Sequence, residues 1–314
     1  MTQQEDECSC REPNCQGHSW PEPRFVHIGY RCPMTTVESS ARTITERPLS
    51  PTIGAEIQGV DLRDEQSDDT IAEIRAALLR WKVIFFRGQA ITTAQHIAFA
   101  RRFGELEIHP ATPKTQEHRE VLRISHGPES RGRENNWHSD VTWREAPSLG
   151  SVLRAIEVPA VGGDTLFADM ELAFENLSPA MKEWLCTLTA THDIARVFAT
   201  RLGKTAEELH EQYPPQHHPV VRTHPETGRR SLYVNTGFTT HIDGLSPVES
   251  NWLLGHLYSQ AALPEYQCRF RWEANSIAFW DNRACQHYAA SDYFPAVRVM
   301  ERVTVAGDRP YFTP

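Results

Sequence analysis

The sequence predicts an α+β fold that is mainly β, in which short strands form a small barrel or jelly roll flanked by helices. Three observations predict it. Up to about residue 104, short apolar strands alternate with helical periodicity. From about residue 121 onward, short β-like segments recur with turn residues between them. No internal repeat or low-complexity linker divides residues 46–314, so we expect a single domain there.

The first part of this domain contains four predicted elements. Alternating apolar and polar residues indicate a strand over 53–62, and apolar residues at helical spacing indicate a helix over 68–81. The apolar run 83–88 ends in glycine and indicates a buried strand. A second helix is expected from about Thr93 to Phe103, with Gly104 as its stop.

Strands dominate the remainder of the domain. They are expected over 121–125, 137–143, 149–157, 164–168, 218–223, 231–236, 268–272, 276–280 and 298–305. The segment 218–234 is expected to form a hairpin about a turn at 225–228. Helices are expected to begin at Ser178, Thr205 and Ser246, and the last two starts match the capping box.

The first 45 residues are expected to form a disordered tail that contains four of the seven cysteines, at positions 8, 10, 15 and 32. Together with His18 these thiols could bind zinc, but their spacings miss the paired CxxC pattern of structural sites. The alternative is a polar tail, and Met34 opens an alternative start of the chain.

Composition limits the partners. There are 32 Lys and Arg residues against 41 Asp and Glu residues, a formal net charge of -9, so no basic field attracts nucleic acid. An anionic small-molecule ligand must therefore be held by locally placed arginines. No run of about 18 apolar residues is present, so no membrane association is expected. The start of the chain has no secretion signal, and a cytoplasmic location is expected by default.

The segment 137–143 carries a candidate metal site. On a strand, His138 and Asp140 project from the same face with Cα atoms about 7 Å apart, which lets both side chains reach one ion. A second histidine from a distant strand would complete a facial triad of the kind that holds non-haem iron(II). In a chain with 15 histidines, the alternative for an isolated HxD pair is ordinary surface hydrogen bonding.

Several segments along the chain provide stronger evidence than the pair of His138 and Asp140. They read FGELEIHP (103–110), NWHSDVTW (136–143), GGDT (162–165), HPVVRTHPETG (218–228), YVNTGFTTHI (233–242), WDNRACQHYA (280–289) and RVMERVTVAGDRPY (298–311). They resemble the taurine/2-oxoglutarate dioxygenase family, also called the TauD/TfdA family, from about Ile53 to Phe312.

The resemblance implies a fold, cofactors and a catalytic centre. The fold would be a double-stranded β-helix, a cupin-like jelly roll, with flanking helices. The iron ligands would be His138, Asp140 and His287. The cofactors would be Fe(II) and the co-substrate 2-oxoglutarate, which react with O2.

Two arginines lie four residues apart on the predicted strand 298–305. Arg298 and Arg302 would face the same side, with Glu301 on the other, and their Cα atoms would be about 13 Å apart. That distance implies two separate anions, unless both arginines are simply solvated on an edge strand. The resemblance implies that Arg298 and Thr165 hold the distal carboxylate of 2-oxoglutarate, because a planar guanidinium suits a carboxylate.

The resemblance also implies the substrate site. Arg302, His109 and Phe238 would hold a sulfonate, with Phe198 as an apolar wall. The sequence departs from the taurine pattern at two positions.

Thr112 stands where taurine-specific members carry Tyr, and Glu134 stands in place of an Asn. Glu134 could pair with an ammonium group through a charge-assisted bond. Equally, both changes could indicate a different sulfonate, a sulfate ester or a carboxylate.

We therefore expect a dioxygenase that hydroxylates a small sulfonate such as taurine at the carbon next to sulfur. The products would be sulfite and an aldehyde, with succinate and CO2. The alternatives are an alkyl-sulfate or aryloxyalkanoate dioxygenase of the same family.

Two alternatives belong to other functional classes of protein. A zinc hydrolase explains neither Arg298 nor Thr165. A non-catalytic β-barrel binding protein is disfavoured because all three metal ligands are present. Members of the family often form dimers or tetramers, so a homodimer and a homotetramer both stay open.

Overall fold

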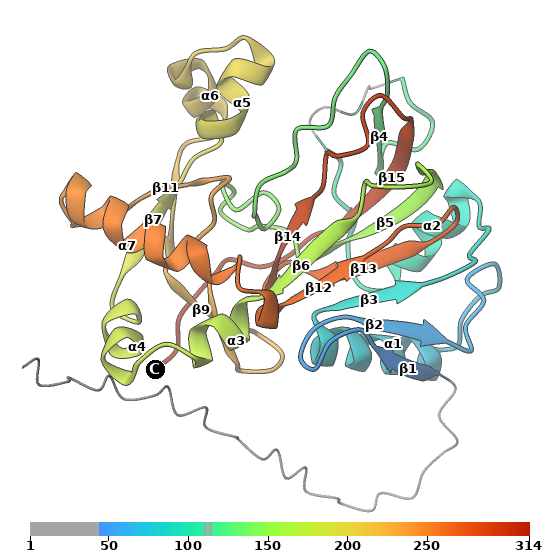
Figure 1. The fold of residues 1–314 in the computed structure, drawn as a ribbon, viewed down its shortest axis with the longest axis horizontal. Helices are drawn as coiled ribbons and strands as arrows, with labels where there is room; N and C mark the ends of the chain where they lie inside the picture. Colours follow the sequence, from blue (N-terminus) through green and yellow to red (C-terminus); the bar gives the residue numbers. More distant parts are fainter. Residues whose placement is uncertain (1–43, 110–111, 113–114) are drawn as a thin grey trace, which may run out of the picture. The chain divides into compact units, whose positions relative to one another are not determined.

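Two sheets and the helices around them organise the described part of the chain (Figure 1). The computed structural model describes residues 44–109, 112 and 115–314. Apart from its last two positions, the cysteine-containing tail predicted for residues 1–45 lies outside the described residues, and so does its candidate zinc cluster.

The larger sheet has seven strands in the order β1-β2-β3-β13-β5-β15-β4. Its strands are β1 (Thr45–Pro48), β2 (Ala55–Gln58), β3 (Val83–Phe86), β4 (Val121–His126), β5 (Gly150–Glu157), β13 (Ile277–Asp281) and β15 (Arg298–Val305). Only β2 and β3 pair in parallel, while the other neighbours are antiparallel. The first and last thirds of the chain thus meet in one sheet.

A three-stranded sheet faces the larger one. Its order is β12-β6-β14, with β6 (Thr165–Asp169), β12 (Gln267–Phe270) and β14 (Cys285–Ala289). One core cluster joins Phe85 of the larger sheet to Phe167 and Phe270 of the smaller one. The rings of Phe85 and Phe270 stack with centroids 4.0 Å apart. Facing sheets with helices at their margins make a mixed, mainly β fold.

Two small sheets extend the β structure. One has the order β11-β7-β8, with β7 (Thr189–His192), β8 (Gln216–Pro219) and β11 (Thr239–Ile242). The other is the hairpin β9 (Val221–Thr223) with β10 (Arg230–Leu232). The hairpin predicted over 218–234 is confirmed, and its turn ends at Gly228, whose φ of 69° suits glycine.

Helices α1 (Asp68–Trp81) and α2 (Thr93–Arg101) pack on the other face of the seven-stranded sheet (Figure 1). The predicted helix over 68–81 matches α1 residue for residue. The remaining helices are α3 (Met170–Glu175), α4 (Pro179–Leu185), α5 (Ala195–Leu202), α6 (Ala206–Gln212), α7 (Pro247–Gln260) and the 3-10 turn η1 (Pro264–Tyr266). Among the described residues no helix is long and apolar enough to cross a membrane.

The three predicted helix starts are confirmed by their caps. The hydroxyls of Ser178, Thr205 and Ser246 accept a backbone N–H from the first turn of α4, α6 and α7. The last two form the reciprocal capping box that the sequence predicted. By contrast, α5 has no side-chain cap and no buried residue.

One predicted strand is wrong. Residues 137–143 contain a single bridge at His138 and then a turn, in which Val141 adopts a φ of 48°. Three other strands are shorter than predicted. Strand β2 stops at Gln58, next to Gly59 with a φ of 87°, the segment 218–223 divides into β8 and β9, and β10 ends at Leu232. In each case the apolar pattern of the sequence continues past the residue where strand pairing ends.

Candidate active site

The backbone brings two distant histidines together. The N–H of His138 donates to the carbonyl of His287 at 3.1 Å, and the N–H of His287 donates back at 2.9 Å. This reciprocal pair places the two imidazole rings 4.2 Å apart, centroid to centroid. Since His287 lies on β14, the bridge attaches the segment around His138 to the three-stranded sheet.

Asp140 reaches the same place through a turn. Its backbone N–H donates to Asn282 Oδ1 at 2.6 Å, and Asn282 Nδ2 donates to its carbonyl at 2.8 Å. The carboxylate accepts from Ser151 Oγ at 3.2 Å. The prediction that a strand places His138 and Asp140 on one face is thus wrong in its mechanism, although the two side chains do converge.

Ligand atoms of His138, Asp140 and His287 all lie within 4.8 Å of one another. The Nδ1 atom of His138 lies 2.8 Å from the carbonyl of Asn136, so this nitrogen donates and leaves Nε2 as the lone-pair nitrogen. Two imidazoles and one carboxylate on one side of a small space fit a divalent metal with open positions.

The protonation states suit a metal. Burial, followed by the neighbouring His138, lowers the pKa of His287 to about 3, so its imidazole is neutral. Burial alone would raise the pKa of Asp140, but the neighbouring guanidinium of Arg302 outweighs it and holds that pKa well below its usual range. Metal ligands must be deprotonated, and His287 and Asp140 meet this requirement.

A second site lies around Arg298, at the start of β15. Arg298 is only 5% exposed, and its Nε and Nη2 have no hydrogen-bond partner among the described residues. Its guanidinium lies 5.9 Å from the ring centroids of both Trp272 and Tyr293. A buried unpaired cation is costly unless an anion joins it, so this geometry fits a bound carboxylate.

Thr165 belongs to the same site. Its Oγ1 accepts a hydrogen bond from Trp272 Nε1 at 2.9 Å, which leaves the hydroxyl proton free to donate to a ligand. The preceding turn closes over the arginine. A Cβ on Gly163 would lie 3.2 Å from Arg298 Cδ, and the φ of 70° at this position also favours glycine.

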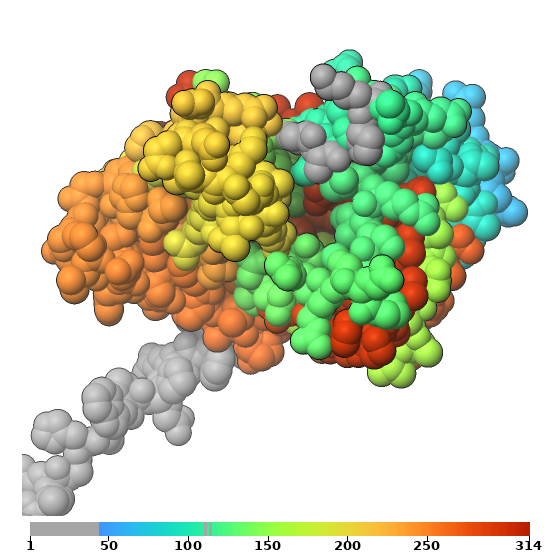
Figure 2. All heavy atoms as spheres, turned by 90° about the horizontal axis from the view of Figure 1, so that it is seen from above, coloured from blue at the N-terminus to red at the C-terminus, as the bar shows by residue number. Residues whose placement is uncertain are grey.

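A cavity of about 180 Å³ opens beside the metal ligands. Its apolar wall comprises Leu122, Ile124, Val141, Trp143, Phe198 and Phe238. Figure 2 shows this hollowed face between the yellow segment of α5 and α6 and the green segment around β4. The rings of Phe198 and Phe238 are parallel, with centroids 6.5 Å apart, and the edge of Phe238 meets His138.

Arg302 and His109 supply polar groups to this cavity. Arg302 Nη1 donates to Asp140 Oδ1 at 3.0 Å, and its buried Nε has no hydrogen-bond partner among the described residues. Burial, with Arg302 and Arg144 nearby, lowers the pKa of His109 to about 4, so this imidazole is neutral. Arg302, which the resemblance assigned to the substrate anion, therefore lies beside Asp140 and lines the cavity.

The two positions that depart from the taurine pattern behave differently. Thr112 is buried, and it does not line the cavity among the described residues. Glu134 does line it, but its carboxylate lies 3.5 Å from Arg201 Nη1 and 3.3 Å from His126 Nε2. The expectation that Glu134 awaits a substrate ammonium is thus weakened, because the guanidinium of Arg201 already pairs with it.

Several supporting residues escaped the sequence analysis. Asn282 and Ser151 hold Asp140, Trp272 and Tyr293 surround Arg298, and Arg201 contacts Glu134. Only Asn282 among them lies within one of the quoted family segments. Arg201 lies in none of them, since it belongs to α5.

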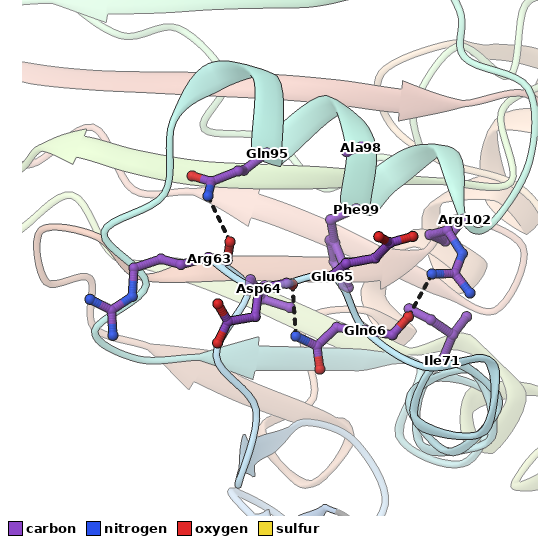
Figure 3. Close-up of a pocket in the computed structure, with 10 residues that line it drawn as sticks. Arg63, Asp64, Glu65, Gln66, Ile71, Gln95, Ala98, Phe99 and Arg102 are labelled. Atoms are coloured by element: carbon purple, nitrogen blue, oxygen red, sulfur yellow. Dashed lines mark hydrogen bonds between the residues drawn. The ribbon is translucent and has the colours of Figure 1, made fainter.

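A larger cavity, of about 310 Å³, lies between α2 and the segment 62–66 (Figure 3). Two of its polar side chains are already engaged: Gln95 donates to the carbonyl of Arg63, and Arg102 donates to the carbonyl of Gln66. None of the metal ligands lines it. We therefore place the active site at the smaller cavity, where the ligand triad is.

Comparisons with known proteins identify the family of the chain. A family model described as the taurine catabolism dioxygenase TauD, TfdA family matches residues 45–304. The chain is 38% identical to an alpha-ketoglutarate-dependent sulfate ester dioxygenase of Pseudomonas putida, over 84% of this chain and 89% of that protein. It is 34% identical to an alkylsulfatase of Acinetobacter baylyi, over 88% and 89%.

A solved structure is also similar to this chain. It is described as that of a putative alpha-ketoglutarate-dependent taurine dioxygenase from Burkholderia xenovorans. It superposes with a TM-score of 0.76 at 40% identity, covering 85% of this chain and 94% of that one.

Proposed function

Because the chain belongs to the TauD/TfdA family and is a 2-oxoglutarate-dependent non-haem iron dioxygenase, we propose that it oxidises an organosulfur anion with an apolar tail, with a sulfate ester preferred over taurine. One observation carries the proposal. The cavity next to the metal ligands combines the guanidinium of Arg302 with a mainly apolar wall. Such a site suits an anionic head followed by a hydrocarbon chain.

The proposed roles follow from the geometry. His138, Asp140 and His287 would hold iron(II), and Arg298 with Thr165 would hold the distal carboxylate of 2-oxoglutarate. Iron(II) and 2-oxoglutarate, when bound, supply the activation of O2. The facing sheets around these residues are the part that we assign to the predicted double-stranded β-helix.

Residues of the cavity would position the substrate. Arg302 would bind the sulfate through a charge-assisted hydrogen bond, and His109 would donate from its neutral imidazole. Phe198 and Phe238 would hold the first carbons of the tail beside His138. Positioning of this kind keeps one C–H bond next to the metal while the wall excludes water.

The proposed reaction balances as follows. One oxygen atom of O2 enters the C–H bond of the carbon that carries the sulfate oxygen, and the other enters succinate as 2-oxoglutarate loses CO2. The hydroxylated ester then breaks its C–O bond to sulfate, releases sulfate with a proton, and leaves an aldehyde. The names of the two relatives described above support the sulfate ester as the class of substrate.

The test is a product analysis. We expect purified enzyme with iron(II), ascorbate, 2-oxoglutarate and hexyl sulfate to form succinate and sulfate in equal amounts. Taurine and an aryloxyacetate serve as comparison substrates. Sulfite from taurine at a higher kcat/KM than sulfate from hexyl sulfate would instead support the taurine-type activity that the sequence analysis preferred.

A zinc hydrolase remains a weaker proposal. A hydrolase has no use for a buried arginine such as Arg298, whose Nε and Nη2 have no hydrogen-bond partner among the described residues. Release of sulfate without consumption of O2 or 2-oxoglutarate would favour it.

A further inference from the structure

Helix α5 places a positive charge on the wall of the active-site cavity. Arg201, in its last turn, lines the same cavity as His138 and Asp140. Its Nη2 donates to the carbonyl of Arg133 at 2.9 Å, and its Nη1 lies 3.5 Å from Glu134 Oε1. The guanidinium is therefore anchored to the segment that leads to the metal ligands, although the helix itself is remote from them in sequence.

The carboxylate of Glu134 is contacted from two sides. While Oε1 faces Arg201, Oε2 accepts from the backbone N–H of Arg133 at 3.0 Å and lies 3.3 Å from His126 Nε2. The pair of Arg201 and Glu134 thus presents two compensating charges to the cavity. A matched pair projects a much weaker field into the cavity than either charge would alone.

The pair lies where a substrate tail would pass. Phe198 and Arg201 are three residues apart on α5, so they share a face of the helix, and both line the cavity. A tail that runs along Phe198 therefore meets the guanidinium one turn later. On this helix the apolar wall and the charge pair form one continuous surface.

We propose that the Arg201–Glu134 pair determines which substrate tails are accepted, and that it selects uncharged tails. This inference rests on the proposed function, which assigns the anionic head to Arg302. An ammonium tail would have to displace Arg201 from Glu134, and a carboxylate tail would have to displace Glu134 from Arg201. An uncharged tail leaves the pair intact.

Two single substitutions should have opposite effects. Arg201→Met keeps an apolar stem of similar shape and leaves Glu134 without its guanidinium, so an ammonium tail gains a partner. Glu134→Gln keeps the shape and leaves Arg201 without its carboxylate, so a carboxylate tail gains a partner. The double variant has no net charge at this point and should again prefer an uncharged tail.

The experiment compares three ligands that share one head. Hexyl sulfate, 6-aminohexyl sulfate and 5-carboxypentyl sulfate are titrated by calorimetry into anaerobic enzyme loaded with iron(II) and 2-oxoglutarate. We expect Arg201→Met to shift the ratio of Kd values toward the amino ligand by about tenfold. Glu134→Gln should shift the ratio toward the carboxy ligand by a similar factor, as one charge-assisted bond is gained in each case.

Matched controls test whether removing a charge elsewhere has the same effect as removing one from the Arg201–Glu134 pair. Arg196 lies on the same helix and donates to the carbonyl of Thr236 without lining the cavity, so Arg196→Met should leave all three ratios unchanged. Glu211 is exposed on α6, and Glu211→Gln should behave in the same way.

The outcomes are distinguishable. If the wild type binds hexyl sulfate but neither pair variant changes the tail ratios, the inference is wrong and the proposed function stands. If the wild type loaded with 2-oxoglutarate binds none of the three sulfates, the proposed function is wrong, and the inference with it. Thermal melting of each variant verifies that a null result is not caused by unfolding.

Discussion

The two sides of the active site are built in different ways. Around the metal ligands and Arg298, the polar groups lie on buried strands or are tied to them by backbone hydrogen bonds, as in the His138–His287 pair. On the side of the substrate tail, α5 supplies Phe198 and Arg201 although none of its residues is buried. The difference indicates that the reaction chemistry is fixed by the sheet, whereas substrate choice is left to an exposed helix that can change without affecting the core.

The strongest test of this contrast removes a metal ligand. Asp140→Ala should lower iron(II) affinity by more than about 100-fold, since even outer partners of ligands cost up to that factor. Anaerobic titration with iron(II) measures the affinity, and substrate-dependent succinate should fall in parallel. Asp64→Ala, at an exposed carboxylate, is the matched control. An Asp140→Ala protein that keeps both its iron and its turnover would remove Asp140 from the ligand set.

The second test concerns the unpaired cation. Arg298→Met should raise the KM for 2-oxoglutarate roughly 30- to 150-fold, as the loss of hydrogen bonds to a charged group costs about 2–3 kcal/mol. The apo variant should be no less stable than the wild type, because an apolar side chain replaces a buried guanidinium without a partner at Nε and Nη2 among the described residues.

Urea unfolding and 2-oxoglutarate kinetics measure both effects of Arg298→Met. Arg123→Met is the matched control on the neighbouring strand β4, where the guanidinium is exposed and pairs with Glu301. A less stable apo variant with an unchanged KM for 2-oxoglutarate would mean that Arg298 serves the fold instead of the co-substrate.

The third test concerns His96, a buried histidine outside the active site that contacts the seven-stranded sheet. Burial lowers the pKa of His96 to about 4, while its Nε2 donates to the carbonyl of Val152 at 3.0 Å. Because the folded pKa lies below that of the unfolded chain, the unfolded chain takes up the proton first as the pH falls. The stability due to the neutral imidazole is thus complete above about pH 6.5 and is lost on the way down to pH 4.

We therefore expect wild type to lose about 2 kcal/mol more unfolding free energy than His96→Gln when the pH falls from 7 to 5. Glutamine keeps a donor for Val152, and urea unfolding at the two pH values measures the difference. His256→Gln, at an exposed position of α7, should follow the wild type. Equal pH dependence in wild type and His96→Gln would contradict a buried neutral imidazole.

The same contrast explains what the sequence could predict. Helix α1 and strand β15 match their predictions to the residue, because each has a strong apolar period and clear ends. The resemblance indicated His138, Asp140 and His287 as metal ligands, and their ligand atoms lie within 4.8 Å of one another. Their convergence was assigned to a strand at 137–143 that does not exist, because the contacts of Asn282 with Asp140, from far along the chain, decide that geometry.

The substrate side was harder to predict for a physical reason. Helix α5 has no capping side chain and buries no residue, so neither caps nor core periodicity indicates it. Glu134 was identified from its place in the sequence, but its partner Arg201 could not be, since a surface contact between a loop and a helix leaves no local pattern. Phe198, which the resemblance indicated, does line the cavity.

The smallest expected effect tests the contrast between sheet and helix at α5. Phe198→Ala removes part of the apolar wall opposite Phe238, which should cost about 1 kcal/mol, or roughly fivefold in kcat/KM, for octyl sulfate. Ethyl sulfate is too short to use this wall and should be unaffected, as should iron(II) affinity. Leu202→Ala is the matched control, since Leu202 is on the same helix, 54% exposed and not part of the cavity wall. An equal loss for ethyl and octyl sulfate would show that α5 supports the reacting centre itself, and the division between a sheet for chemistry and a helix for selection would fail.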